Sequence, residues 1–180
     1  MKVFTIGHST RSFDDFLQTL SQYGIDMVVD VRRIPESQKF PHFDRKFLEK
    51  ELPSHGIAYS SFTDIGGFRK GGYKAFAASP QFKELQKKLL SIMKGKHAVL
   101  LCSEILWYRC HRRYIAEELV KSGFPVVHIY NKEKTQNHVL HDAEIEEKML
   151  MKIYCDENPI EEGTPEPRIG EELKESLEKF

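Results

Sequence analysis

Residues 97–102, with the sequence HAVLLC, form the clearest buried strand that the sequence predicts. An unbroken apolar run of this length is typical of a strand covered on both faces, as in parallel sheets. Short apolar runs bounded by polar or glycine residues predict four more strands, at 1–7, 27–31, 57–59 and 126–129. We therefore expect a sheet of about five strands.

Helical segments alternate with these strands along the chain. Apolar residues at helical spacing predict helices after Ser12, over 43–52, from Ser79-Pro80 to about residue 92, and over 109–122. Serine before the first turn and proline within it are typical of helix starts, and the glycines at 24 and 123 fit helix ends. This alternation predicts an α/β fold: one three-layer domain over 1–140, with a mostly parallel sheet and helices on both faces.

The charged side chains are unevenly distributed. The 180 residues hold 27 basic and 27 acidic side chains, so the formal net charge is zero. Residues 1–140 contain 22 basic and 14 acidic side chains, a net charge of +8, and residues 141–180 contain 5 and 13, a net charge of −8. We expect 141–180 to be an acidic, partly helical C-terminal extension. Either the basic part binds an anionic partner, or both parts are ordinary solvated surfaces.

The composition also indicates a cellular setting. The three cysteines, at positions 102, 110 and 155, are too few for a disulfide framework. The N-terminal residues lack the apolar region of a secretory signal, and no apolar run approaches the roughly 18 residues of a membrane span. We therefore expect a cytoplasmic protein without membrane contacts, and the sequence leaves its oligomeric state open.

Most of the reactive side chains follow the predicted strands. In parallel α/β sheets, ligands bind beyond the carboxyl ends of the strands. The candidate residues at this edge, in chain order, are His8, Ser9, Asp30, Arg32, Tyr59, Cys102, Glu104 and His128. Because they come from distant segments of the chain, their convergence on one edge predicts a site.

Two arginines are candidates for binding an anion at this edge. Arg32 follows the second predicted strand, and Arg112 lies near the start of a predicted helix, where backbone N–H groups also attract anions. A planar guanidinium can bind phosphate or carboxylate through two parallel hydrogen bonds. Ser9 is a third candidate for the anion site. The alternative for Arg32 is an ion pair with Asp30.

Cys110 is the candidate nucleophile. It lies between Arg109 and His111 near a predicted helix start, and such surroundings lower the pKa of a thiol and favour the thiolate. His111, His8 or His128 could act as general acid or base beside it.

A zinc site is an alternative use of the same residues. Cys102, Cys110, His111 and His128 offer the sulfur and nitrogen ligands that Zn²⁺ prefers, although their spacing matches no standard zinc motif. Cys102 ends an apolar strand and could instead be a small buried side chain. Since the sequence has neither a Walker loop nor a dinucleotide fingerprint, it predicts no cofactor apart from this zinc alternative.

The motifs form a recognisable set. They are TIGHS at 5–9, DVR at 30–32 with Pro35 and Ser37, Phe43, GI at 56–57 with Tyr59, GG at 66–67, LCSE at 101–104, CHR at 110–112 and HI at 128–129. As a set they resemble the family numbered 488 among the domains of unknown function, over about residues 1–130. Two features depart from the family pattern: Ser103 stands where alanine is more common, and 105–109 differs from the usual acidic or proline-containing link. The resemblance implies a compact α/β domain and no established reaction.

These observations lead to an expected function. We expect an enzyme that acts on a phosphate-bearing substrate such as a nucleotide or nucleic acid. Arg32 and Arg112 would bind the anionic oxygens, while Asp30 and Glu104 would orient groups or transfer protons. In a covalent mechanism, Cys110 would be the nucleophile.

Two alternatives belong to other functional classes. The first is a nucleic-acid-binding module without catalysis, which draws on basic residues such as Arg45 and Lys46 and on the aromatic residues Phe40, Phe43 and Trp107. The second is an interaction domain stabilised by zinc.

Overall fold

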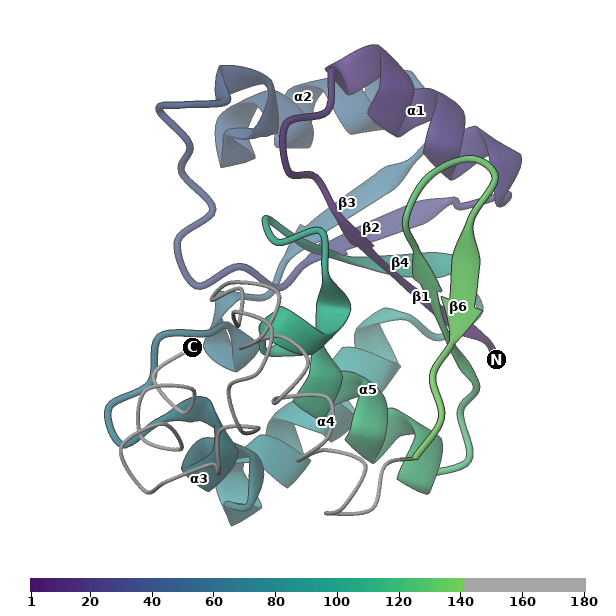
Figure 1. Cartoon of the computed structure of the whole chain (residues 1–180). Helices are drawn as coiled ribbons and strands as arrows, with labels where there is room; N and C mark the ends of the chain where they lie inside the picture. The colour runs from purple at the N-terminus through teal and green to yellow at the C-terminus, as the bar shows by residue number, and fades with distance from the viewer. Residues whose placement is uncertain (141–180) are drawn as a thin grey trace, which may run out of the picture.

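The computed structural model of the chain describes residues 1–140 (Figure 1). A six-stranded sheet with the order β3-β2-β4-β1-β5-β6 forms its centre. The strands are β1 Val3–Gly7, β2 Met27–Asp30, β3 Ala58–Ser61, β4 Ala98–Cys102, β5 Val126–Ile129 and β6 Thr135–Asn137. The first five are parallel, and β6 pairs antiparallel with β5. The partly helical extension predicted over 141–180 lies outside the described residues.

The predicted α/β fold with a mostly parallel sheet is confirmed. Each of the five predicted strands is present, with ends within two residues of those expected. β6 is an addition that the sequence does not predict, because its three polar residues are all exposed and show no apolar pattern. It reaches the sheet through a tight turn in which the Tyr130 backbone N–H donates to the carbonyl of Lys134.

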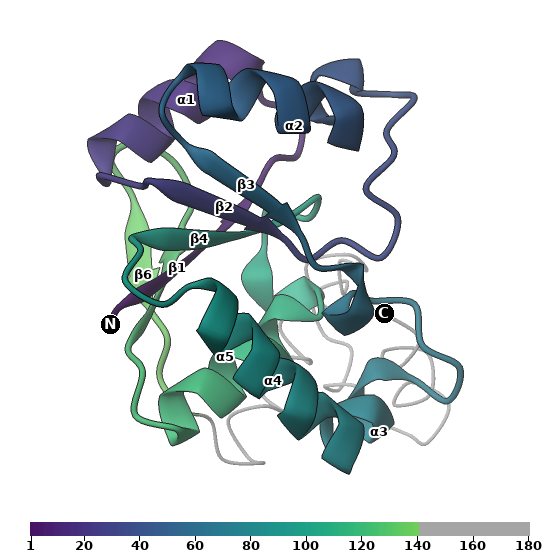
Figure 2. The same ribbon diagram turned by 180° about the vertical axis from the view of Figure 1, so that it is seen from behind.

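Helices cover both faces of the sheet, as predicted (Figures 1 and 2). On one face lie α1 Phe13–Gln22 and α2 Arg45–Ser54, whose buried residues pack with Val28, Val99 and Leu101 of the sheet. On the other lie α3 Tyr73–Ala77, α4 Pro80–Ile92 and α5 Arg112–Lys121, which pack with Val29 and Leu100. Three 3₁₀ turns complete the list: η1 Pro41–Phe43, η2 Thr63–Ile65 and η3 Trp107–Arg109. No helix within residues 1–140 is long and apolar enough to cross a membrane.

The helix starts follow the capping signals in the sequence, with one informative exception. The Ser12 and Ser79 hydroxyls accept the N–H groups of Asp15 and Phe82, as expected at N-caps. The helix predicted over 109–122 is instead divided into η3 and α5, with Cys110 and His111 between them. Cys110 therefore lies just outside the helix, where its side chain can reach the first N–H groups of α5.

Two glycines allow loops at the carboxyl edge to approach each other closely. A Cβ atom on Gly7, the last residue of β1, would lie 1.9 Å from the carbonyl oxygen of Glu104. A Cβ atom on Gly66 would lie 2.5 Å from the backbone nitrogen of Arg33. Real side chains do not fit at such distances, so these glycines bring the loop after β4 against β1 and the loop after η2 against β2.

We predict that Gly7→Ala lowers the free energy of unfolding by about 3 kcal/mol, because the added methyl group collides with backbone that cannot rotate away. Urea denaturation followed by circular dichroism measures the loss. Gly95→Ala is the matched control, since Gly95 has a φ of +73° and no atom within 4 Å of its Cβ position. Its cost should be about 1–2 kcal/mol, from the backbone conformation alone. Equal losses in the two variants would contradict the close approach.

Candidate functional site

A cavity of about 520 Å³ opens at the carboxyl edge of the sheet. Its lining comes from the segments after β2 and β4, from the glycine-rich loop at 67–72 and from residues 109–111. Five of the predicted site residues line it, namely Arg32, Cys102, Glu104, Cys110 and His111. The other six lie outside this lining, and most of them contact residues that form it.

Asp30 and Arg32 form a buried ion pair at the end of β2. Arg32 Nε and Nη2 donate to the two carboxylate oxygens of Asp30 at 2.8 and 2.5 Å. Tyr59 Oη on β3 donates to Asp30 Oδ2 at 2.8 Å, and burial together with the charge of Asp30 raises the pKa of Tyr59. Asp30 is fully buried, and Arg32 is 5% exposed. The pair thus fixes the orientation of Arg32 at the cavity and occupies much of its guanidinium.

His8 supports this pair from the end of β1. Its Nδ1 lies 3.0 Å from the Ser9 carbonyl, and its Nε2 lies 3.4 Å from Arg32 Nη1. The ring stacks on Phe43 with centroids 4.2 Å apart. Burial, and then the charge of Arg32, lower the pKa of His8 to about 4. His8 is therefore neutral at neutral pH and positions Arg32, and Ser9 beside it adopts a φ of +46° outside the cavity lining.

Cys110 is held at the cavity wall by Arg112. The Arg112 side chain donates to Cys110 Sγ from Nε at 3.1 Å, and its backbone N–H donates to the same atom at 3.4 Å. Arg112 is 1% exposed, and its Nη2 donates to the carbonyl of Glu104. The sequence predicts that Arg112 binds a substrate anion. In the structure this guanidinium faces the cysteine and the loop after β4, so we assign it the stabilisation of the thiolate.

The pKa values of the two cysteine thiols at the cavity are shifted in opposite directions. Burial would raise the pKa of Cys110, but a hydrogen bond from Cys102 and the charge of Arg112 outweigh it and lower the pKa to about 6. The same hydrogen bond, with burial, raises the pKa of Cys102 well above its usual value. The Cys110 thiol is therefore more acidic than a free thiol, and Cys102 is the thiol that donates to it.

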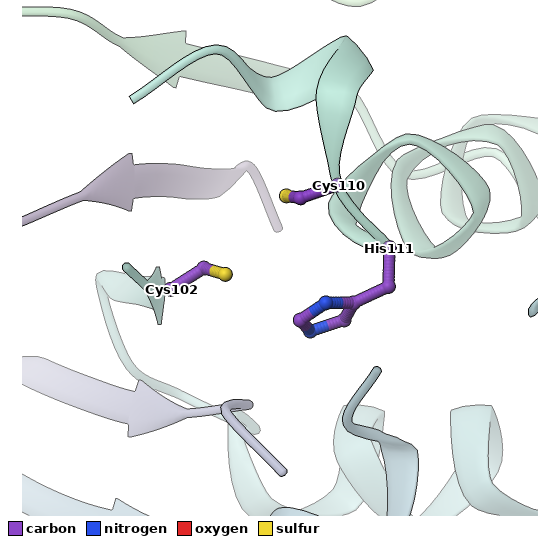
Figure 3. Close-up of side chains that lie close together, drawn as sticks. All are labelled: Cys102, Cys110 and His111. Atoms are coloured by element: carbon purple, nitrogen blue, oxygen red, sulfur yellow. The ribbon is translucent and has the colours of Figure 1, made fainter. Parts of the chain in front are cut away.

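His111 completes a compact group with the two cysteines (Figure 3). Its Nε2 lies 2.8 Å from the carbonyl oxygen of Val31, which makes Nε2 the protonated nitrogen and leaves Nδ1 as an acceptor. A Cβ atom on Gly67 would lie 3.2 Å from Nδ1. One ligand atom from each of Cys102, Cys110 and His111 lies within 4.8 Å of the others, so these three residues could hold a metal ion.

His128 does not belong to this group. It lies in β5 level with Thr5, two residues before the end of β1, and stacks on Trp107 with ring centroids 4.2 Å apart. Its Nδ1 contacts Thr5 Oγ1 at 2.8 Å, and its Nε2 contacts His138 Nδ1 at 3.0 Å. Of the four zinc ligands that the sequence suggests, Cys102, Cys110 and His111 therefore lie together. His128 packs against Trp107 and His138 instead.

Sequence reasoning missed three basic residues of the cavity. Arg33, Arg69 and Arg109 line it beside Arg32, and Glu104 is the one acidic side chain among the described residues of the lining. Arg69 is fixed by a hydrogen bond from its Nε to the Gly66 carbonyl at 3.0 Å and by stacking over Phe76. The glycine-rich loop that contains Arg69 was the available signal, because long loops in compact domains are commonly functional.

The comparison with known families agrees with the motifs at this edge. Residues 12–119 match a family described as domain of unknown function DUF488. The chain belongs to the DUF488 family. The matched range includes every cavity residue named above and ends before His128. No curated protein and no solved structure matches the chain. The description of the DUF488 family assigns no reaction, so the function must be argued from the site.

We predict that Asp30→Asn destabilises the protein by about 3–5 kcal/mol, because it leaves the buried charge of Arg32 without a counter-charge. Tyr59→Phe is the matched control, since it removes one hydrogen bond to the same carboxylate and should cost about 1 kcal/mol. Urea denaturation measures both losses. Similar losses of unfolding free energy in the two variants would show that the charge of Asp30 does not contribute to stability.

We predict that iodoacetamide alkylates Cys110 with a midpoint near pH 6, because only the thiolate reacts. Above the midpoint the rate should level off, and below it the rate should fall about tenfold per pH unit. Peptide mass spectrometry on a Cys155→Ser background identifies the modified residue. Arg112→Lys, which loses Nε, should move the midpoint upward, provided that circular dichroism shows a folded variant. A midpoint near 8.5, typical of a free thiol, would contradict the assignment.

Proposed function

We propose that this DUF488 protein is an enzyme in which Cys110 is the nucleophile toward an anionic, phosphate-bearing substrate held in the cavity. One observation carries the proposal: Cys110 Sγ accepts two N–H groups of Arg112 at the wall of a cavity rich in arginine. A guanidinium that donates to a cysteine sulfur stabilises the thiolate, which is the form that acts as a nucleophile.

The cavity suits an anion of moderate size. Its volume lies within the roughly 300–1,000 Å³ of small-molecule sites, which accommodates a nucleotide or a sugar phosphate. Arg33, Arg69 and Arg109 are the residues that we assign to phosphate binding, with Arg32 contributing the part of its guanidinium that Asp30 leaves open. Guanidinium groups bind phosphate oxygens through parallel hydrogen bonds, which also orients the substrate.

His111 and Glu104 are the candidates for proton transfer. Burial, the largest influence, lowers the pKa of His111, so the imidazole is neutral at neutral pH and Nδ1 can accept a proton. The Glu104 carboxylate lines the same cavity and accepts the Leu106 backbone N–H at 3.0 Å. In the proposed reaction, the Cys110 thiolate attacks the phosphorus atom of the substrate, the bond from phosphorus to the leaving oxygen breaks, and that oxygen takes a proton from solvent. One of these two groups then removes a proton from the water that attacks the same phosphorus atom, which releases phosphate and restores the thiolate.

The nucleic-acid-binding alternative loses part of its basis. Phe43 and Trp107, two of the aromatic residues that it draws on, are 0% and 2% exposed and so are not available for stacking on bases. The basic residues Arg45 and Lys46 lie in α2, and neither lines the cavity. The two functions therefore place the anion at different surfaces, which a pair of variants can separate.

We predict that a phosphate-bearing ligand raises the melting temperature of the wild type and loses this effect in Arg33→Gln. A thermal-shift panel of nucleotides, sugar phosphates, short oligonucleotides and inorganic phosphate tests this, since a ligand at 100 times its Kd adds about 2.7 kcal/mol. Arg45→Gln is the matched control and should retain the shift. Cys110→Ser should bind the ligand and lose at least about 100-fold in turnover.

Three results would contradict the proposal. The first is a panel without any stabilising ligand. The second is a shift that is lost in Arg45→Gln and kept in Arg33→Gln, which would indicate nucleic-acid binding at α2. The third is full turnover in Cys110→Ser, which would remove the thiolate from the reaction.

A further inference from the structure

Cys102 contributes a second thiol that the proposed reaction does not use. It is the last residue of β4, is 4% exposed and lines the same cavity as Cys110. The two sulfur atoms lie within 4.8 Å of each other, and both are free thiols (Figure 3). A small oxidant that enters the cavity therefore meets two thiols at once.

We propose that Cys110 and Cys102 form a reversible disulfide when a hydroperoxide enters the cavity. Formation of the bond requires the sulfur atoms to close to about 2.05 Å. Cys110 lies between η3 and α5 in an extended conformation, with φ −135° and ψ 173°. Its backbone N–H donates to the carbonyl of Trp107 at 3.4 Å and its carbonyl accepts the Arg113 N–H at 3.2 Å, so a shift toward β4 has to stretch these two long hydrogen bonds and the contact of the sulfur with Arg112.

The charges at the site favour a disulfide over a bound metal ion. Arg112 Nε lies 3.1 Å from Cys110 Sγ, and the guanidinium of Arg32 lies near enough to Cys102 for their charges to interact. The charge of Arg32 is already balanced by Asp30, so it is the charge of Arg112 that stabilises the Cys110 thiolate and opposes a divalent cation placed between the same sulfur atoms. The thiolate of Cys110 already has its counter-charge in Arg112.

The chemistry has two steps. The Cys110 thiolate attacks the outer oxygen of the hydroperoxide, the O–O bond breaks, and Cys110 becomes a sulfenic acid while the alcohol or water leaves with a proton. Cys102 then loses its proton and attacks the sulfur atom of Cys110. The S–S bond forms and the hydroxyl leaves as water. Two thiols are oxidised by two electrons, and the hydroperoxide is reduced.

The contacts of Arg112 make this disulfide easy to reduce. Oxidation removes the negative charge that accepts Nε–H of Arg112 and leaves a buried guanidinium with a weaker partner. Stabilisation of the reduced form is what makes a disulfide a strong oxidant. An external dithiol should therefore restore both thiols rapidly. One consequence rests on the proposed function. A peroxide would reversibly inactivate the nucleophile, and the disulfide would protect Cys110 from irreversible oxidation.

The full chain with Cys155→Ser is the protein to test. After one equivalent of hydrogen peroxide at pH 7, we expect the intact mass to fall by about 2 Da and a linked peptide to join Cys102 and Cys110. Dithiothreitol should reverse both changes. Cys102→Ser in this background should give a Cys110 sulfenic acid that reacts with dimedone. Cys110→Ser should be oxidised roughly 100-fold more slowly, because the remaining thiol is mostly protonated.

Two outcomes would overturn the inference. One is a wild-type Cys110 that accumulates as sulfenic or sulfinic acid while Cys102 stays reduced. The other is about one equivalent of zinc in the purified protein, by elemental analysis, that blocks oxidation of both thiols. Because the mass measurement needs no substrate, a missing disulfide removes this inference alone. A missing ligand in the thermal-shift panel removes the proposed function alone.

Discussion

The guanidinium of Arg112 is the constraint on which the carboxyl edge depends. A charge that is 1% exposed costs several kcal/mol unless its surroundings compensate it. The compensation comes from the sulfur of Cys110, the carbonyl of Glu104 and a weaker contact to Thr5 at 3.5 Å. One side chain thus joins α5, the loop after β4 and the interior of β1. The same contact that satisfies the buried charge also lowers the pKa of the Cys110 thiol, so the fold and the acidity of this thiol share one interaction.

A second buried charge pair repeats this arrangement on the neighbouring strand. Asp30, the last residue of β2, pairs with Arg32 just after the strand, and Cys110, which lies beside Cys102 at the end of β4, pairs with Arg112. Gly7 lets the loop that carries Glu104 approach β1, and Arg112 donates to the carbonyl of Glu104 in that loop. The charges of Asp30, Arg32 and Arg112 thus have partners within the protein, and the cavity lining adds the side chains of Arg33, Arg69 and Arg109.

The sequence predicts the layers well and the directions of side chains poorly. Strands such as 98–102 are apolar because both faces are covered, and this pattern needs no knowledge of tertiary contacts. β6 is held by backbone pairing, which leaves no trace in its polar residues. The assignments of Arg112 and His128 to the site follow from their chain positions. The direction of Arg112 depends on the loop path between Cys102 and Cys110, which spacing does not reveal, and that of His128 depends on the register of β5, which places it level with Thr5.

The contacts between Arg112 and the loop after β4 involve the backbone of the loop and not its side chains. Arg112 binds this loop through the carbonyl groups of residues 104 and 105, and carbonyl groups are the same in every amino acid. The side chains of Ser103, Glu104 and Arg109 meanwhile face the cavity. Substitutions at these positions change the lining of the cavity and leave the backbone contacts of Arg112 in place. Residues 105–109, where the sequence departs most from the family pattern, lie in this loop. Within it Trp107 is 2% exposed and stacks on His128, so one buried side chain and the backbone carbonyl groups anchor the stretch, and its cavity-lining side chains do not.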